Sequence, residues 1–218
     1  MTSHTSLSGP RRACAAALVS ISLMSVAACS GGGTPPPESP QSASQSPSEA
    51  PTPSATPTPT ASYKPADATG KAQNVPVPEL PEAAKAETKE GLEAFARYWF
   101  ILLSYGYETG DTSRLDAITS SDCRACEKAK AVISGWHEGG RWIAGGKVQT
   151  PSVSTTFKVA PDGNYQVAIQ ASQAALSYYN ADGTLEQAAA KPEDTGNLML
   201  AVFKDGSWYV NNIQPIVG

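Results

Sequence analysis

The spacing of the apolar residues changes at Gly139–Gly140, and this change constrains the fold more than any other feature of the chain. On the N-terminal side, apolar residues recur at helical spacing. The clearest helical set is Leu92, Phe95, Trp99 and Leu102. On the C-terminal side, they alternate with polar residues, as in half-buried strands. The clearest alternating set is Val153, Thr155, Phe157 and Val159. Helices followed by a run of antiparallel strands predict an α+β domain, with N-terminal helices packed on an antiparallel sheet.

Caps and turns set the expected boundaries of these elements. Helices are expected over residues 82–109, 113–118 and 123–138, because glycines and capping residues bound these segments. Turn sequences are expected to separate the strands at residues 161–164, 180–183 and 204–207. Residues 198–203, LMLAVF, are apolar on both faces, which predicts a central strand of the sheet.

The N-terminus has the three parts of a secretory signal peptide. Arg11 and Arg12 precede an apolar segment, residues 13–28, that is too short to span a membrane. The segment ends in Val26-Ala27-Ala28-Cys29, which resembles the lipobox of bacterial lipoproteins. The resemblance implies that residues 1–28 are removed and that Cys29 is acylated, which would anchor the exported protein to the outer face of the cell membrane. A soluble secreted protein with a chance cysteine is the alternative.

Composition divides the rest of the chain into a linker and one domain. The residues after Cys29 are rich in Pro, Ser and Thr, and such a segment cannot bury enough apolar surface to offset its ordering entropy. We therefore expect a disordered linker over residues 29–78 and a globular domain over residues 79–218. The length of the second segment suits a single domain.

The charge of the chain argues against one class of partner. The formal net charge is −4 at pH 7, and loss of the signal peptide would remove two arginines and no acidic residue. An acidic chain without a basic stripe is a poor binder of nucleic acid. The membrane, reached through the lipid on Cys29, is the partner that the sequence favours most.

The order of the expected elements resembles a known fold. A long helix, the break at Gly110-Asp111, two short helices, a curved sheet and the terminal Gly206-Ser207-Trp208 are similar to the cone-shaped nuclear transport factor two-like fold. The lipobox, the linker and the sequence DCRAC also resemble a group of uncharacterised actinobacterial lipoproteins with such a domain. The resemblance implies a cone of helices on a curved sheet but assigns no activity. A cystatin-like arrangement is the alternative.

Cys123 and Cys126 are the other two thiols outside the signal segment. At i and i+3 of a helix, their Cα atoms would lie about 5–5.5 Å apart, within the range of a disulfide. We expect a structural disulfide in an exported chain, because the strand that precedes a redox-active CxxC is missing here. A thiol redox protein is the alternative. A zinc site that adds His137 does not match the spacing of known zinc modules. No catalytic residue, metal or cofactor is assigned.

Five aromatic residues are the candidate lining of an apolar cleft between helix and sheet. They are Tyr98, Trp99, Tyr105, Trp136 and Trp142. Such a cleft suits a small hydrophobic ligand, although the same side chains could simply fill the core. The most favoured function is a non-catalytic module that binds a ligand or a cell-envelope protein. A pocket enzyme of the cone-shaped fold is the alternative, and no acidic residue falls at an inward-facing position of an expected strand.

Replacing the lipobox cysteine tests the anchor. Cys29→Ser removes the nucleophile for acylation, so we expect an unlipidated precursor that keeps its signal peptide. Mass spectrometry of the N-terminal peptide checks this. An unmodified mature N-terminus at another residue of the wild-type chain would contradict it.

Overall fold

The computed structural model describes residues 61–216. The expected signal peptide, Cys29 and the linker up to residue 60 lie outside the described residues. Within residues 61–216, no helix is both long enough and apolar enough to cross a membrane.

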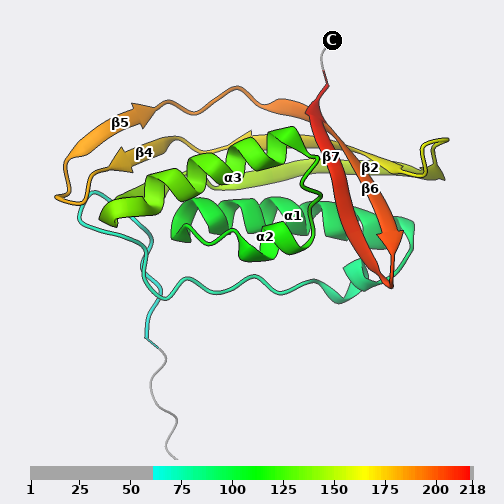
Figure 1. Ribbon diagram of the computed structural model, residues 1–218, viewed down its shortest axis with the longest axis horizontal. Coiled ribbons are helices and arrows are strands. Elements are labelled where there is room, and N and C mark those ends of the chain that lie inside the picture. Colours follow the sequence, from blue (N-terminus) through cyan, green and yellow to red (C-terminus); the bar gives the residue numbers. More distant parts are fainter. Residues whose placement is uncertain (1–60, 217–218) are drawn as a thin grey trace, which may run out of the picture. The chain divides into compact units, whose positions relative to one another are not determined.

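Helices occupy the first half of the described chain and strands the second, which confirms the α+β class (Figure 1). The helical elements are the 3-10 turn η1 (Glu82–Lys85), α1 (Lys89–Thr109), α2 (Ser113–Ala117), α3 (Arg124–His137) and the 3-10 turn η2 (Glu138–Gly140). The strands are β1 (Trp142–Gly145), β2 (Val148–Val159), β3 (Tyr165–Gln173), β4 (Leu176–Tyr179), β5 (Leu185–Ala189), β6 (Thr195–Lys204) and β7 (Ser207–Pro215).

The strands form two antiparallel sheets that continue into each other. One has the order β2-β3-β6-β7 and the other the order β1-β4-β5. Because β1 leads into β2, β3 into β4 and β5 into β6, the two sheets are the halves of one bent sheet. The bend needs glycine at Gly145 and Gly146, which both have positive φ. A Cβ on Gly145 would lie 2.2 Å from the carbonyl oxygen of Ala175, and one on Gly146 would lie 2.2 Å from the side chain of Leu176.

The space between α1 and the inner face of the four-stranded sheet is filled by side chains. The largest fully buried ones include Trp208, Phe95, Leu92, Leu102, Ile169 and Met199. Both buried indoles in this region have acceptors: Trp99 Nε1 donates to Thr119 Oγ1 at 2.9 Å, and Trp208 Nε1 donates to the carbonyl of Ala86 at 3.0 Å. The helix–sheet interface is therefore a packed core.

The outer edges of the four-stranded sheet are occupied by groups from the helical layer. At β2, Arg97 Nη1 of α1 donates to the carbonyl of Thr150 at 2.5 Å, and Thr155 N donates to Glu93 Oε1 at 3.3 Å. At β7, the backbone of Val210 bonds to the segment that follows α2, with distances of 2.9 Å and 2.8 Å. Backbone groups that would otherwise be free at each edge are thus paired.

The long helix begins later than its sequence pattern predicts. Residues 82–85 form the 3-10 turn η1. The helical conformation is then interrupted, and α1 starts at Lys89 with Thr88 as its N-cap. Thr88 Oγ1 accepts a hydrogen bond from Gly91 N at 3.0 Å. This interruption of the helix is stabilised because the Ala86 carbonyl accepts a hydrogen bond from the Trp208 indole. The other helix boundaries agree better with the sequence pattern. α1 ends at Thr109, as predicted, and α2 and α3 lie within the predicted segments.

The folded part also begins earlier than expected. Residues 62–81, here called the strap, were predicted to be linker up to residue 78, yet they lie along the helical layer (Figure 1). Antiparallel bridges join Lys64 to Gln73 and Asp67 to Gly70. Trp142 Nε1 donates to the carbonyl of Asp67 at 2.9 Å. Contacts with distant residues order this segment, and its own composition gives no sign of them.

The ends of α1 and α3 meet at His137. Its Nε2 donates to the carbonyl of Tyr107 at 3.0 Å, and a Cβ on Gly110 would lie only 2.6 Å from its ring. Gly110 has a φ of 80° and closes α1. Burial lowers the pKa of His137 below its ordinary value, and the nearby charge of Lys71 adds to this. His137 is therefore neutral at pH 7 and does not serve as a charged partner of the α3 dipole.

A glycine pair tests the close approach at the start of α1. A Cβ on Gly91 would lie 2.2 Å from the Ala86 carbonyl oxygen, whereas a Cβ on Gly135 of α3 would meet nothing within 4 Å. We expect Gly91→Ala to lower the free energy of unfolding by about 1–3 kcal/mol, as overpacking does. Gly135→Ala is the matched control and should raise it by up to about 1 kcal/mol, because alanine favours helix. Urea denaturation measures both, and equal effects would contradict the expectation.

The pKa of His137 generates a second expectation. Because the folded state lowers this pKa, the unfolded state binds the proton more readily, and stability falls as the pH drops below the unfolded value of about 6.5. The free energy of unfolding should therefore decrease between about pH 7.5 and pH 5. His137→Gln keeps a donor for Tyr107 but cannot titrate, so its stability should change less over this range. The same slope in both proteins would rule out this role for His137.

Candidate functional site

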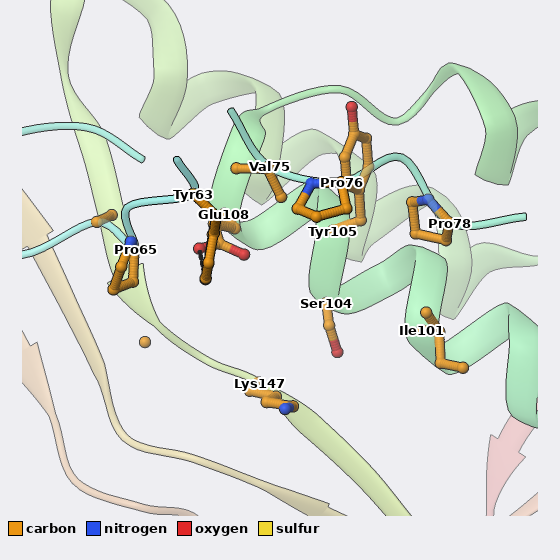
Figure 2. A pocket seen from close by; sticks show the side chains of 12 residues that line it. Tyr63, Pro65, Val75, Pro76, Pro78, Ile101, Ser104, Tyr105, Glu108 and Lys147 are labelled. Atoms are coloured by element: carbon orange, nitrogen blue, oxygen red, sulfur yellow. Dashed lines mark hydrogen bonds between the residues drawn. The ribbon is translucent and has the colours of Figure 1, made fainter. Parts of the chain in front are cut away.

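A cavity of about 440 Å³ lies between the strap and α1. Figure 2 shows its lining, to which the strap, α1 and the turn between β1 and β2 contribute. The lining residues are Tyr63, Pro65, Ala66, Val75, Pro76, Pro78, Ile101, Ser104, Tyr105, Glu108, Gly145 and Lys147. A cavity of this size is within the range of small-molecule sites.

The helix contributes one stripe of side chains to this cavity. Ile101, Tyr105 and Glu108 are spaced i, i+4 and i+7, so they share one face of α1. The residues between them that face the sheet, such as Leu102, are buried in the core. The strap covers part of the stripe with proline rings, which are apolar and lack a backbone N–H. The walls of the cavity are therefore mostly apolar.

A hydrogen bond between Tyr63 and Glu108 ties the strap to α1 at one side of the cavity. The Tyr63 hydroxyl donates to Glu108 Oε1 at 2.5 Å (Figure 2). This bond, with smaller effects from burial and from the charge of Glu108, raises the pKa of Tyr63 to about 12. The phenol therefore keeps its proton at neutral pH and remains a donor to the carboxylate.

Ser104 holds the start of β2 against the helix. Its hydroxyl donates to the carbonyl of Phe100 at 3.0 Å and accepts from Val148 N at 2.9 Å. The carbonyl of Lys147, the preceding residue, accepts from Ala174 N at 2.9 Å. The backbone of Lys147 is thus fixed beside the cavity, while its side chain is exposed.

The five aromatic residues suggested by the sequence do not meet around one cavity. Tyr105 lines the pocket. Tyr98 and Trp99 are 5 % and 3 % exposed and belong to the core. Trp142 binds the strap and stacks on Tyr179, with ring centroids 5.3 Å apart. Trp136 packs on Tyr178 with centroids 4.7 Å apart. The expectation of a cleft between helix and sheet is therefore wrong. Buried side chains fill that space, and the cavity lies where the strap covers α1.

Tyr63, Glu108 and Lys147 are not among the site residues that the sequence predicts. A signal for the strap residues was present, because an aromatic residue and charges reappear from Tyr63 onward after a run of Pro, Ser and Thr. The i, i+4, i+7 spacing of Ile101, Tyr105 and Glu108 was a second signal. Nothing local points to Lys147, which the bend of the sheet brings to the cavity.

The two cysteines lie apart from this cavity, at the start of α3. Their Cα atoms are 5.2 Å apart and the sulfurs are at disulfide distance. Cys123 is the N-cap residue of α3, and both side chains are buried, with 0 % and 1 % exposure. Burial of both sulfurs suits a staple at the helix start better than exchange with a thiol substrate. In the part of the chain that the structure describes, no three His, Cys, Asp or Glu side chains cluster as metal ligands.

A buried lysine stabilises the contact between α2 and α3. Lys130 is 8 % exposed and pairs with Asp116 of α2 and with Glu127 one turn earlier on α3. Burial alone would lower the pKa of Lys130, but the hydrogen bonds to these two carboxylates outweigh it and raise the pKa. This triad is a structural ion-pair group that joins two helices.

Comparison with known proteins identifies a family, and the solved structures that match include two with low sequence identity. The intermembrane space region of the chloroplast protein ARC6 matches 60% of this chain and 98% of its own, with 10% identity and a TM-score of 0.41. Aln2 from a Streptomyces species matches 57% of this chain and 87% of its own, with 10% identity and a TM-score of 0.35. No curated protein matches the sequence. The family model described as a family of unknown function (DUF6318) matches residues 61–214. These residues are most of the chain and include the strap, and the protein therefore belongs to the family of unknown function DUF6318.

Proposed function

We propose that the protein is an exported, lipid-anchored binding protein whose domain takes a small apolar ligand into the cavity between the strap and α1. The observation that carries the proposal is this cavity of about 440 Å³ with mostly apolar walls. Proteins bind small ligands in concave, largely apolar sites that contain a few polar groups. The strap and α1 supply this arrangement.

The polar groups of the cavity favour binding over catalysis. The Ser104 hydroxyl already makes two hydrogen bonds, and the Glu108 carboxylate accepts from a phenol whose pKa is raised. A nucleophile needs an adjacent base within hydrogen-bond reach. Ser104 has backbone partners instead, so its hydroxyl holds the start of β2 against α1. We therefore propose a non-catalytic module.

The sequence before the strap supports an anchored location. The lipobox at Val26–Cys29 would supply the lipid, and the Pro-, Ser- and Thr-rich residues 30–60 would act as a spacer between membrane and domain. A disulfide between Cys123 and Cys126 would suit an oxidising compartment outside the cell. We propose on the same grounds that the chain is one of the actinobacterial lipoproteins that it resembles.

The fold type is also part of this proposal. The element order, with a long helix, two short helices and then a bent sheet, supports a variant of the nuclear transport factor two-like fold. In this variant the helix–sheet space is filled, and the ligand site has moved to the outer side of α1 under the strap.

Filling the cavity tests the binding function. The probe is 4-(trifluoromethyl)phenol, a water-soluble apolar ring that ¹⁹F NMR detects, added to the full-length chain in detergent. Ile101 is 48 % exposed, so Ile101→Trp can be accommodated at the surface and should occupy the cavity. We expect saturable binding to the wild type and affinity weaker by at least about tenfold in this variant.

Leu185→Trp is the matched control, because Leu185 is 55 % exposed on β5 and does not line the cavity. It adds the same indole in the same detergent, and it should bind the probe as the wild type does. Absence of saturable binding to the wild type, or equal binding by Ile101→Trp, would overturn the proposed function.

A further inference from the structure

The cavity carries one charge of each sign, and this pairing indicates the ligand. Glu108 reaches it from α1 and Lys147 from the turn between β1 and β2 (Figure 2). We propose that the ligand is a short apolar peptide with free ends, whose ammonium binds Glu108 and whose carboxylate binds Lys147. This inference rests on the proposed function and names the ligand class for the same cavity.

Glu108 is suited to a ligand ammonium because its partner in the cavity is a neutral group. Among residues 61–216 it forms no ion pair, and the hydrogen bond that it accepts comes from the neutral hydroxyl of Tyr63. Lys71 and His137 line a second cavity that also borders Glu108, and burial lowers the pKa of His137.

Lys147 is suited to a ligand carboxylate because its backbone is fixed and its ammonium has no ion-pair partner within the described part of the chain. Its carbonyl accepts from Ala174 N, and the following residue, Val148, is held by Ser104. The two glycines before it allow the chain to bend at this point. The exposed side chain is free to meet an anion at the edge of the cavity.

The apolar walls of the cavity select a ligand with an apolar body. Val75, Pro76 and Ile101 offer no donors from their side chains, and the strap prolines offer no backbone N–H. A ligand with a single charge would leave one of the two protein charges without a partner. A zwitterion with an apolar body satisfies both charges.

Four forms of trileucine test this pairing by isothermal titration calorimetry with the full-length chain. They are the free peptide, the N-acetylated peptide, the C-terminal amide and the peptide blocked at both ends. Each charge-assisted hydrogen bond should matter by at least about tenfold in affinity. We therefore expect the free peptide to bind most tightly and the doubly blocked form most weakly.

Two variants assign each end of the peptide to its residue. Glu108→Gln keeps an acceptor for Tyr63 and should weaken the free and amidated peptides by about tenfold, with little effect on the N-acetylated forms. Lys147→Met keeps the apolar stem and should weaken the free and N-acetylated peptides, with little effect on the amidated forms. The matched controls are Glu90→Gln at the start of α1 and Lys158→Met on β2, which do not line the cavity.

Equal affinity for all four forms, or no peptide binding while the fluorinated phenol still binds, would overturn the peptide assignment and leave the apolar site in place. The opposite assignment of ends to residues would overturn it as well. If the phenol does not bind the wild type, or binds Ile101→Trp equally well, the proposed function is overturned as well. The assignment would be supported if each variant lost affinity only for the peptides that carry the free end assigned to the substituted residue.

Discussion

The packing of α1 on the inner face of the bent sheet is the interaction on which the other parts of the structure depend. Trp208 occupies the centre of this contact, beside Phe95 and Phe203, and its indole donates to the carbonyl of Ala86. This one side chain therefore packs in the core and also holds the break before α1. Because the buried face of the helix is fixed in this way, the stripe from Ile101 to Glu108 must face outward, where the strap covers it.

The strap depends on that arrangement for its order. Specific polar contacts hold it: the Trp142 indole donates to the Asp67 carbonyl, the Tyr63 phenol donates to Glu108, and the Tyr98 hydroxyl makes a weaker contact with the Pro78 carbonyl at 3.4 Å. Each partner outside the strap belongs to an element that the core positions. The pocket thus depends first on the packed core, which positions α1, and then on the strap, which binds to the outer side of α1.

Much of the fold could be predicted from the sequence because the decisive signals are local. The change from helical to alternating spacing identified the class, and Gly110 marked the end of α1 where the structure has it. The start of α1 could not be predicted in this way, since the break before Lys89 depends on Trp208, which is 122 residues away from Ala86. The order of the strap was missed for the same reason, because Trp142 and Asp67 are separated by 75 residues. The candidate pocket residues were chosen as aromatic residues near α1, but helical geometry directs Trp99 to the core and Tyr105 to the strap.

The paired edges of the four-stranded sheet have a consequence for how copies of this chain behave when crowded. An edge strand with free backbone groups is a template on which a second molecule can add its own strand, and such growth leads to fibrils. Here two side chains of α1 and the segment after α2 bond to backbone groups of the outermost strands, so these groups cannot pair with a strand of a second molecule. The helical layer that fills the core thus also shields backbone groups at both edges of this sheet.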